Sequence, residues 1–150
     1  MKSFTIPIFL LLTILWSTYT SGCRSQRSHP ATYTGKQLLF GNGGGFTGET
    51  TTYLLLDNGY LFRVTTDMRT TKENYTPLKK LSGKITQQLF SKANDLQISQ
   101  TEFSHPGNIY YFIGIKNKQT THRITWGDPS YTAPIDAENL YHQLTASLPQ

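Results

Sequence analysis

The residues whose types and spacing best fit binding chemistry form a glycine-rich segment, residues 41–48, with the sequence GNGGGFTG. Gly43, Gly45 and Gly48 satisfy the pattern G-x-G-x-x-G of phosphate-binding loops. A dinucleotide site needs a helix after this pattern, whereas a β-rich run follows here, and the Walker and protein-kinase motifs are missing. The segment therefore indicates a wide turn or bulge with positive φ angles, whose exposed backbone amides could still bind an anion.

Phe46 lies between these glycines and has two interpretations. It is either a plug that folds back into the core or an exposed anchor for a partner. Five glycines in eight residues make the loop entropically costly to order, which favours a functional role. We hypothesise that the protein-binding residues are Gly43, Gly44, Gly45, Phe46 and Thr47.

A second candidate site is aromatic. Trp126 and Tyr131 flank a Gly-Asp-Pro turn, and Tyr110 and Phe112 are expected on the outer face of the preceding strand. The structural interpretation of the turn is closure of the core. The alternative is a stacking surface for a sugar or a peptide, because aromatic rings combine a large apolar face with a polar edge.

The remaining titratable residues predict no catalytic or metal site. The four histidines match no metal-ligand spacing, and the carboxylates are few and dispersed, with roles in turns and caps. No G-x-S-x-G element is present, although the members of a Ser/His/Asp triad need not be close in sequence. We therefore expect a protein without a cofactor or enzymatic activity, with an unrecognised hydrolase as the less favoured alternative.

The first 23 residues indicate where in the cell the protein is located. Residues 4–16 are an apolar run of 13 residues after a basic start, too short to span a bilayer but suited to a secretory signal. The only cysteine, Cys23, ends a segment that resembles a bacterial lipobox, whose cysteine is acylated. A plain signal peptide cut near residue 21 or 22 is the alternative. An exported chain with one cysteine has no disulfide partner for it, which favours acylation.

We therefore expect a lipoprotein signal peptide over residues 1–22, and lipidated Cys23 followed by a flexible tether over residues 23–37. The remaining basic residues are scattered, and residues 23–150 carry a net charge of +4. This mild excess favours anionic head groups or acidic partners and argues against nucleic acid.

Two β-hairpins must position the candidate sites. Asn58-Gly59 between β-rich runs predicts a hairpin over residues 50–66 with a two-residue turn. That turn would pair Leu55 with Phe62 and Tyr53 with Val64, so that the four side chains share one face.

The second hairpin covers residues 108–127 and turns at Asn117-Lys118, which sets Ile113 opposite His122 and Tyr111 opposite Ile124. Its predicted core face consists of Ile109, Tyr111, Ile113, Ile115, Ile124 and Trp126.

Each hairpin is followed by apolar residues at helical spacing, over residues 81–96 and 137–148, with Ser82 and Asp136 as expected N-caps. With a strand near residues 37–40, the order is strand, hairpin, helix, hairpin, helix. Residues 38–150 are therefore expected to form a single two-layer α+β domain: an antiparallel sheet of about five strands with two helices packed on one face.

The lipobox, the F-G-N-G-G-G-F-T-G loop, the strand ending in D-N-G and the segment I-T-W-G-D together resemble small lipoproteins of Bacteroidota. The resemblance covers most of residues 38–148 and implies a lipid-anchored envelope protein, with no activity to carry over. Arg24 after the cysteine resembles outer-membrane sorting, facing the periplasm. We expect a non-enzymatic interaction module that binds an envelope protein as an inhibitor or accessory subunit; the alternative is a small-ligand or glycan binder.

Overall fold

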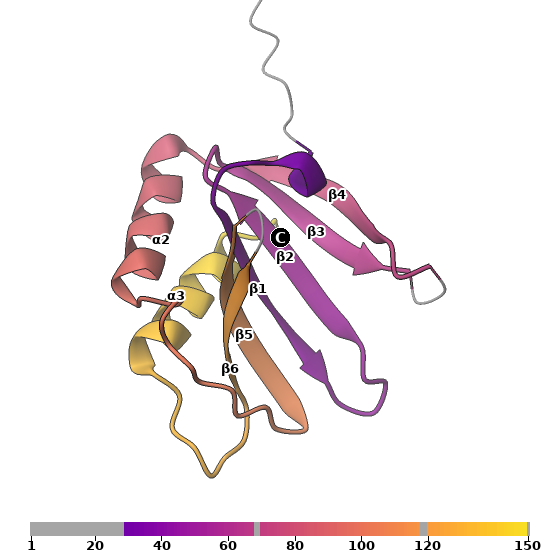
Figure 1. Cartoon of the computed structure of the whole chain (residues 1–150), viewed down its shortest axis with the longest axis vertical. Helices are drawn as coiled ribbons and strands as arrows, with labels where there is room; N and C mark the ends of the chain where they lie inside the picture. Colours follow the sequence, from indigo (N-terminus) through magenta and orange to yellow (C-terminus); the bar gives the residue numbers. More distant parts are fainter. Residues whose placement is uncertain (1–28, 68–69, 118–119, 150) are drawn as a thin grey trace, which may run out of the picture.

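The computed structural model describes residues 29–67, 70–117 and 120–149, which form one curled antiparallel sheet with two α-helices on one face (Figure 1). The strand order is β4-β3-β2-β1-β5-β6. The strands are β1 (Gln37–Gly44), β2 (Thr50–Leu56), β3 (Tyr60–Thr66), β4 (Glu73–Lys80), β5 (Ile109–Lys116) and β6 (Thr121–Trp126). The helices are η1 (Pro30–Thr32), a 3-10 turn, α2 (Gly83–Asp95) and α3 (Ile135–Ala146).

The predicted α+β class is confirmed, with six strands in the sheet instead of about five. The additional strand is β4, whose sequence ENYTPLKK is mostly exposed and contains Pro77. An edge strand with proline and lysines lacks the apolar alternation by which strands are recognised.

Strand β1 occupies the centre of the sheet, antiparallel to β2 and β5. Half of the glycine-rich segment, residues 41–44, therefore lies in a strand and not in the expected wide turn. A Cβ atom at Gly41 would lie 2.0 Å from the Thr51 carbonyl oxygen and 2.9 Å from the Phe112 ring, so no larger residue fits. The expected positive φ angles occur where this strand ends, at Gly44 and Gly45, and at Gly48 in the loop that follows.

The register predicted for the first hairpin is wrong by one residue. Leu55 pairs with Leu61, and Leu54 pairs with Phe62. The amide of Gly59 donates to the Leu56 carbonyl oxygen (2.8 Å) and Gly59 has φ 91°, so the tight turn precedes Gly59 and this glycine adds a bulge. Because a slip of one residue exchanges the two faces, Phe62 lies on the face opposite to Leu55.

The register of the second hairpin differs by two residues from the prediction. Ile113 pairs with Ile124, and Tyr111 pairs with Trp126. The Asn117 amide donates to the Thr120 carbonyl oxygen (2.9 Å), so the strands are connected one residue later in the chain than predicted. A slip of two residues preserves the faces, so Ile113, Ile124 and Trp126 are buried on the helix side as predicted.

Both predicted helices are present, but only one is capped as expected. The Ser82 side chain accepts a hydrogen bond from the Ile85 amide (3.3 Å) at the start of α2. Helix α3 begins after Pro134, without a side-chain cap, and Asp136 lies inside its first turn. There the carboxylate complements the positive end of the helix dipole without capping it.

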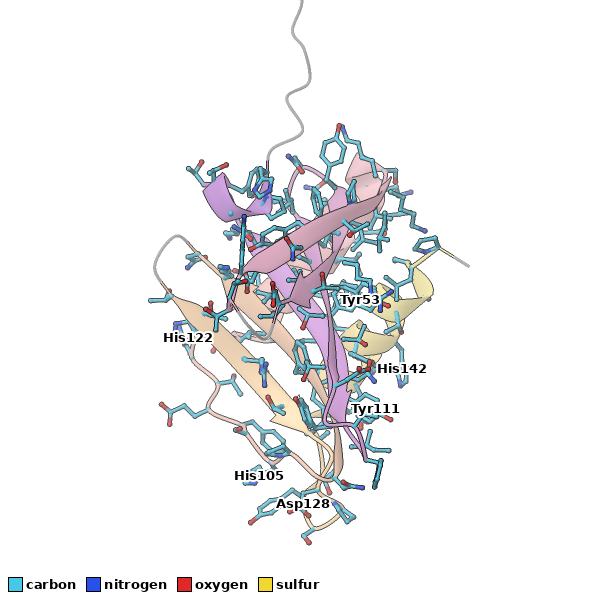
Figure 2. The ribbon with its side chains drawn as sticks, turned by 90° about the vertical axis from the view of Figure 1, so that its right-hand side faces the viewer. Tyr53, His105, Tyr111, His122, Asp128 and His142 are labelled. Atoms are coloured by element: carbon cyan, nitrogen blue, oxygen red, sulfur yellow. The ribbon has the colours of Figure 1, made fainter. Side chains whose placement is uncertain are left out.

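The curled sheet buries apolar side chains on both faces. The main core lies under α2 and α3, and a second cluster on the other face consists of Leu54, Leu56, Phe62 and Val64. The curl brings the beginning of β4 to the end of β5, where Lys116 Nζ lies 3.9 Å from Glu73 Oε2 although three strands separate β4 from β5 in the sheet. Figure 2 shows β4 crossing in front of the sheet.

Residues 29–36, which the predicted flexible tether includes, are held against the domain by hydrogen bonds. The Tyr33 hydroxyl donates to the Asp57 carboxylate, and the Lys36 amide donates to Asp57 Oδ2 (2.8 Å). Gln37 is buried in β1, and its side-chain amide donates to the Pro30 carbonyl oxygen (3.2 Å).

The expected signal peptide (residues 1–22), Cys23 and tether residues 24–28 lie outside the described residues. Within the described part, neither helix has the length and apolar character that crossing a bilayer requires.

Candidate functional site

The antiparallel strands give the domain two ends with different side chains. We call the end that contains residues 29–36 and the turn at Asp57 the proximal end, because the described chain begins there. The distal end contains loop 44–49, the beginning of β5 and residues 127–134 (lower part of Figure 1).

Phe46 is fully exposed at the distal end, so the plug interpretation is wrong. Its relative accessibility is 108 %, and those of Ile109 and Tyr111 at the beginning of β5 are 53 % and 38 %. The loop that carries Phe46 is fixed against β5, because the Gly45 amide donates to the Asn108 carbonyl oxygen (2.7 Å). Three large apolar side chains from two connected segments are thus exposed at one end of the sheet.

Half-buried tyrosines adjoin these exposed side chains. The ring of Tyr141 on α3 lies 5.4 Å from that of Tyr111 and 5.6 Å from that of Trp126. Burial raises the pKa of Tyr141, and the neighbouring Tyr111 and Tyr53 raise it further, so its hydroxyl is protonated at neutral pH. Figure 2 shows Tyr53 and Tyr111 on the side of the sheet that α3 covers. We define the tip surface as Phe46, Ile109, Tyr111, Tyr53 and Tyr141.

The tip surface has the chemistry of a protein-binding surface. It combines exposed apolar side chains with tyrosine side chains, which carry a hydroxyl group. Exposed apolar groups of this kind mark interaction sites, and tyrosine is enriched in interfaces. A groove of about 390 Å³ lies elsewhere, between α2 and α3, and Lys92, Asp136 and Gln143 help to line it. Among the described residues, no three His, Cys, Asp or Glu side chains are grouped to hold a metal ion.

The glycine loop does not offer the expected anion cradle. The amide of Gly44 donates to the Glu49 carbonyl oxygen (3.2 Å), that of Gly45 to Asn108, and that of Gly48 to the Gly45 carbonyl oxygen (3.2 Å). These three amides are therefore committed to holding the loop closed. What the loop presents to a partner is the side chain of Phe46.

The four aromatic residues of the alternative site are not brought together. Phe112 and Trp126 are 1 % and 6 % exposed and belong to opposite faces of the sheet, so they cannot form one stacking surface. Tyr110 lies over Gly43, with its hydroxyl 2.9 Å from Thr50 Oγ1. Tyr131 is half-exposed and stacks on His105 with 3.6 Å between ring centroids.

Tyr110 and Phe112 lie on the face away from the helices, as expected, but they pack over the glycines of β1 and do not form an open aromatic surface. Gly41 pairs with Phe112, and Gly43 pairs with Tyr110, so the two rings fill the space that β1 side chains would occupy. The guanidinium of Arg123 lies 4.3 Å from the centre of the Phe112 ring and covers it. These rings support the sheet and are not a platform for a ligand.

Sequence reasoning placed Phe46 in the candidate site and missed the rest of the tip surface. Ile109 and Tyr111 alternate correctly for a core face, but they lie beyond the part of that face that the helices bury. Periodicity gives the face of a strand and does not say where the covering helix ends. The proximity of the loop to β5, and of β5 to α3, depends on topology that the sequence did not reveal. In comparison with known proteins, the chain matches no family model and no curated protein.

Proposed function

We propose that this protein is a non-enzymatic interaction module of the bacterial envelope, anchored through acylated Cys23, that binds a protein partner with the tip surface. The full exposure of Phe46 carries the proposal. Burying a phenylalanine side chain contributes about 1.5–3 kcal/mol, and a fixed loop that leaves it in water keeps that contribution available for association. The partner is an envelope protein, and this chain acts on it as an inhibitor or accessory subunit.

The geometry of β1 supports this arrangement. The strand begins at the proximal end with Gln37 and ends at the distal end with Gly44, next to the Phe46 loop. At about 3.4 Å per residue, these eight residues span roughly 25 Å. A lipid on Cys23 would therefore hold the proximal end near the membrane and leave the tip surface facing away from it.

The lipobox and the resemblance to Bacteroidota lipoproteins support an outer-membrane location facing the periplasm as part of the same proposal. A mass spectrum of the chain purified from envelopes tests the anchor directly. We expect acyl chains on Cys23 as the new N-terminus, and their loss in Cys23→Ser. An unmodified cysteine would refute the anchor and leave the tip surface to be tested separately.

Partner binding is tested by affinity capture from detergent-solubilised envelopes with the purified chain as bait. We expect one stoichiometric protein that is lost with Phe46→Ala and with Ile109→Ser. Ile85→Ser is the matched control, because Ile85 is exposed to a similar extent (44 %) on α2, outside the tip surface. The proposal fails if both tip variants keep the partner, or if the control loses it equally while all variants retain their thermal transitions.

A further inference from the structure

We infer that the proximal end of the domain is a docking surface for anionic phospholipid headgroups, which fixes how the domain sits on its membrane. The inference rests on the proposed function, because the anchor decides which end meets the bilayer. We define the basic surface by its five lysines: Lys36, Lys79, Lys80, Lys84 and Lys116.

The strand registers gather these lysines from separate parts of the chain. Gln37 pairs with Lys116, which places Lys36 and Lys116 at the same end of neighbouring strands. Tyr60 pairs with Lys80 at the beginning of β3, and the Lys80 ammonium lies 4.8 Å from the Tyr60 ring. Each of these contacts is at the proximal end.

Helix α2 starts at the same end. Lys84 lies in its first turn, directly after β4. Lys36 lines a groove together with Gly83 of this helix and with Asp57, so the N-terminal segment and the helix are close in space. Lys36, Lys79, Lys80 and Lys84 are exposed, and Lys116 is half-buried.

The carboxylates near the basic surface are engaged within the domain. Asp57 accepts hydrogen bonds from the Tyr33 hydroxyl and the Lys36 amide. Glu73 accepts one from the Tyr75 hydroxyl and lies 3.9 Å from Lys116. Of these lysines, the ion pair occupies only Lys116, so the surface has a net positive charge.

The distal end of the domain is acidic, so the charge is distributed unequally between the two ends. Loop 44–49, the end of α2, the segment before β5, the β6–α3 connection and the first turn of α3 carry carboxylates. They are Glu49, Asp95, Glu102, Asp128, Asp136 and Glu138. A domain with lysines at one end and carboxylates at the other would turn its basic end toward a negatively charged bilayer.

The short connection to Cys23 puts the basic surface within reach of headgroups. Because residues 29–36 are docked on the sheet, only residues 24–28 separate the anchor from the domain. At no more than about 3.6 Å per residue, Cys23 lies within roughly 20 Å of His29. Attraction between lysines and headgroups decays over about 8 Å at physiological salt, so an anchor this short keeps the surface where that attraction acts.

Vesicle co-sedimentation of the mature chain, residues 23–150, tests the inference, with Cys23→Ser so that neither acylation nor the apolar run of residues 4–16 contributes to binding. The probe is phosphatidylglycerol and phosphatidylcholine vesicles (30:70) against pure phosphatidylcholine. We expect tighter binding to the anionic vesicles, reduced about tenfold by Lys79→Glu with Lys80→Glu and abolished at high salt. Lys36→Glu with Lys84→Glu should act equally and does not disturb the Lys80–Tyr60 contact.

The matched control compares single charge reversals at the two ends of α2: Lys84→Glu in its first turn, and Lys92→Glu in its last turn, outside the basic surface. We expect less than a twofold loss for Lys92→Glu. An equal loss for Lys84→Glu and Lys92→Glu would reduce the effect to net charge and overturn the inference, as would equal binding to both vesicle types. Because the assay uses neither the lipid nor Phe46, its failure is distinct from failure of the anchor or of the tip surface.

Discussion

The proximal and distal ends of the same sheet are built in different ways. At the proximal end, apolar side chains fill both faces, and residues 29–36 are docked on the Asp57 turn. At the distal end, β1 contributes Gly41, Gly43 and Gly44, and neighbouring rings fill the space above two of them. The difference teaches that the contacts that stabilise the fold are separate from the groups available for binding, since Phe46, Ile109 and Tyr111 are exposed where the helices no longer cover the sheet.

The largest effect on stability is expected at Gly41, where the Thr51 backbone and the Phe112 ring leave no space for a side chain. Gly41→Val should lower the free energy of unfolding by about 3 kcal/mol or more, because the new Cβ meets the Thr51 carbonyl oxygen and the Phe112 ring. Urea denaturation measures the change. Gly48→Ala is the control: its site is open but has φ 66°, so it should lose only about 1–2 kcal/mol. Equal losses would mean that β1 is not packed as described.

At the proximal end, the substitution expected to destabilise the fold most is at Asp57. Asp57→Ala removes the acceptor of the Tyr33 hydroxyl and of the Lys36 amide, and we expect a loss of about 1–2 kcal/mol in the free energy of unfolding, since the bonds are exposed. Asp136→Ala at the distal end should lower the free energy of unfolding by roughly 0.3–1 kcal/mol, because it removes only the interaction of a carboxylate with the helix dipole. If the two variants were equally stable, residues 29–36 would not hold the proximal end.

The proximal end should also respond to alkali. Burial, then the hydrogen bond and charge of Asp57, raise the pKa of Tyr33 from 10.0 to about 12. Because the pKa is higher in the folded state, this stabilisation is complete below pH 10 and is lost as the pH rises toward 12. Tyrosinate absorbance and melting temperatures between pH 9 and 12 measure it.

In Tyr33→Phe the melting temperature should fall less between pH 10 and 12 than in the unmodified chain. Burial and Glu73 also raise the pKa of Tyr75, so some alkaline sensitivity remains in this variant. An unchanged pH profile would show that the Tyr33–Asp57 contact contributes nothing to folding.

The smallest effect on stability is expected at the most exposed side chain. Phe46→Ser should change the free energy of unfolding by less than about 0.5 kcal/mol, because Phe46 is fully exposed. Thermal unfolding of the two proteins checks this directly. A loss of several kcal/mol would show that Phe46 is core and would remove the basis of the tip surface.

Local sequence signals predicted the elements better than their registers. Ser82 and the apolar spacing after it located α2, and the alternation in β5 gave the correct faces. The turn at Asn58-Gly59 was predicted, but a bulge at Gly59 shifts the register by one residue. Phe62 and Val64 therefore both lie on the face opposite to the one predicted. A turn dipeptide marks a hairpin without fixing the length of the loop.

The candidate site was less predictable, because exposure depends on contacts between distant segments. The composition of residues 41–48 drew attention to Phe46, but the two interpretations of its side chain differed only in where the loop docks. Asn108, more than 60 residues away, accepts the hydrogen bond that fixes it. Likewise, Phe112 is buried because its partner in β1 is Gly41, and nothing local to β5 indicates this.

The central position of β1 has a mechanical consequence. If the anchor and a bound partner pull in opposite directions, the force enters through residues 29–36 and runs along β1. The hydrogen bonds of β1 to β2 and β5 lie across this direction, so they are loaded together in shear and are not peeled one at a time. The contacts of Asp57 should yield first and release residues 29–36, about 25–30 Å of slack, before the sheet bears the load.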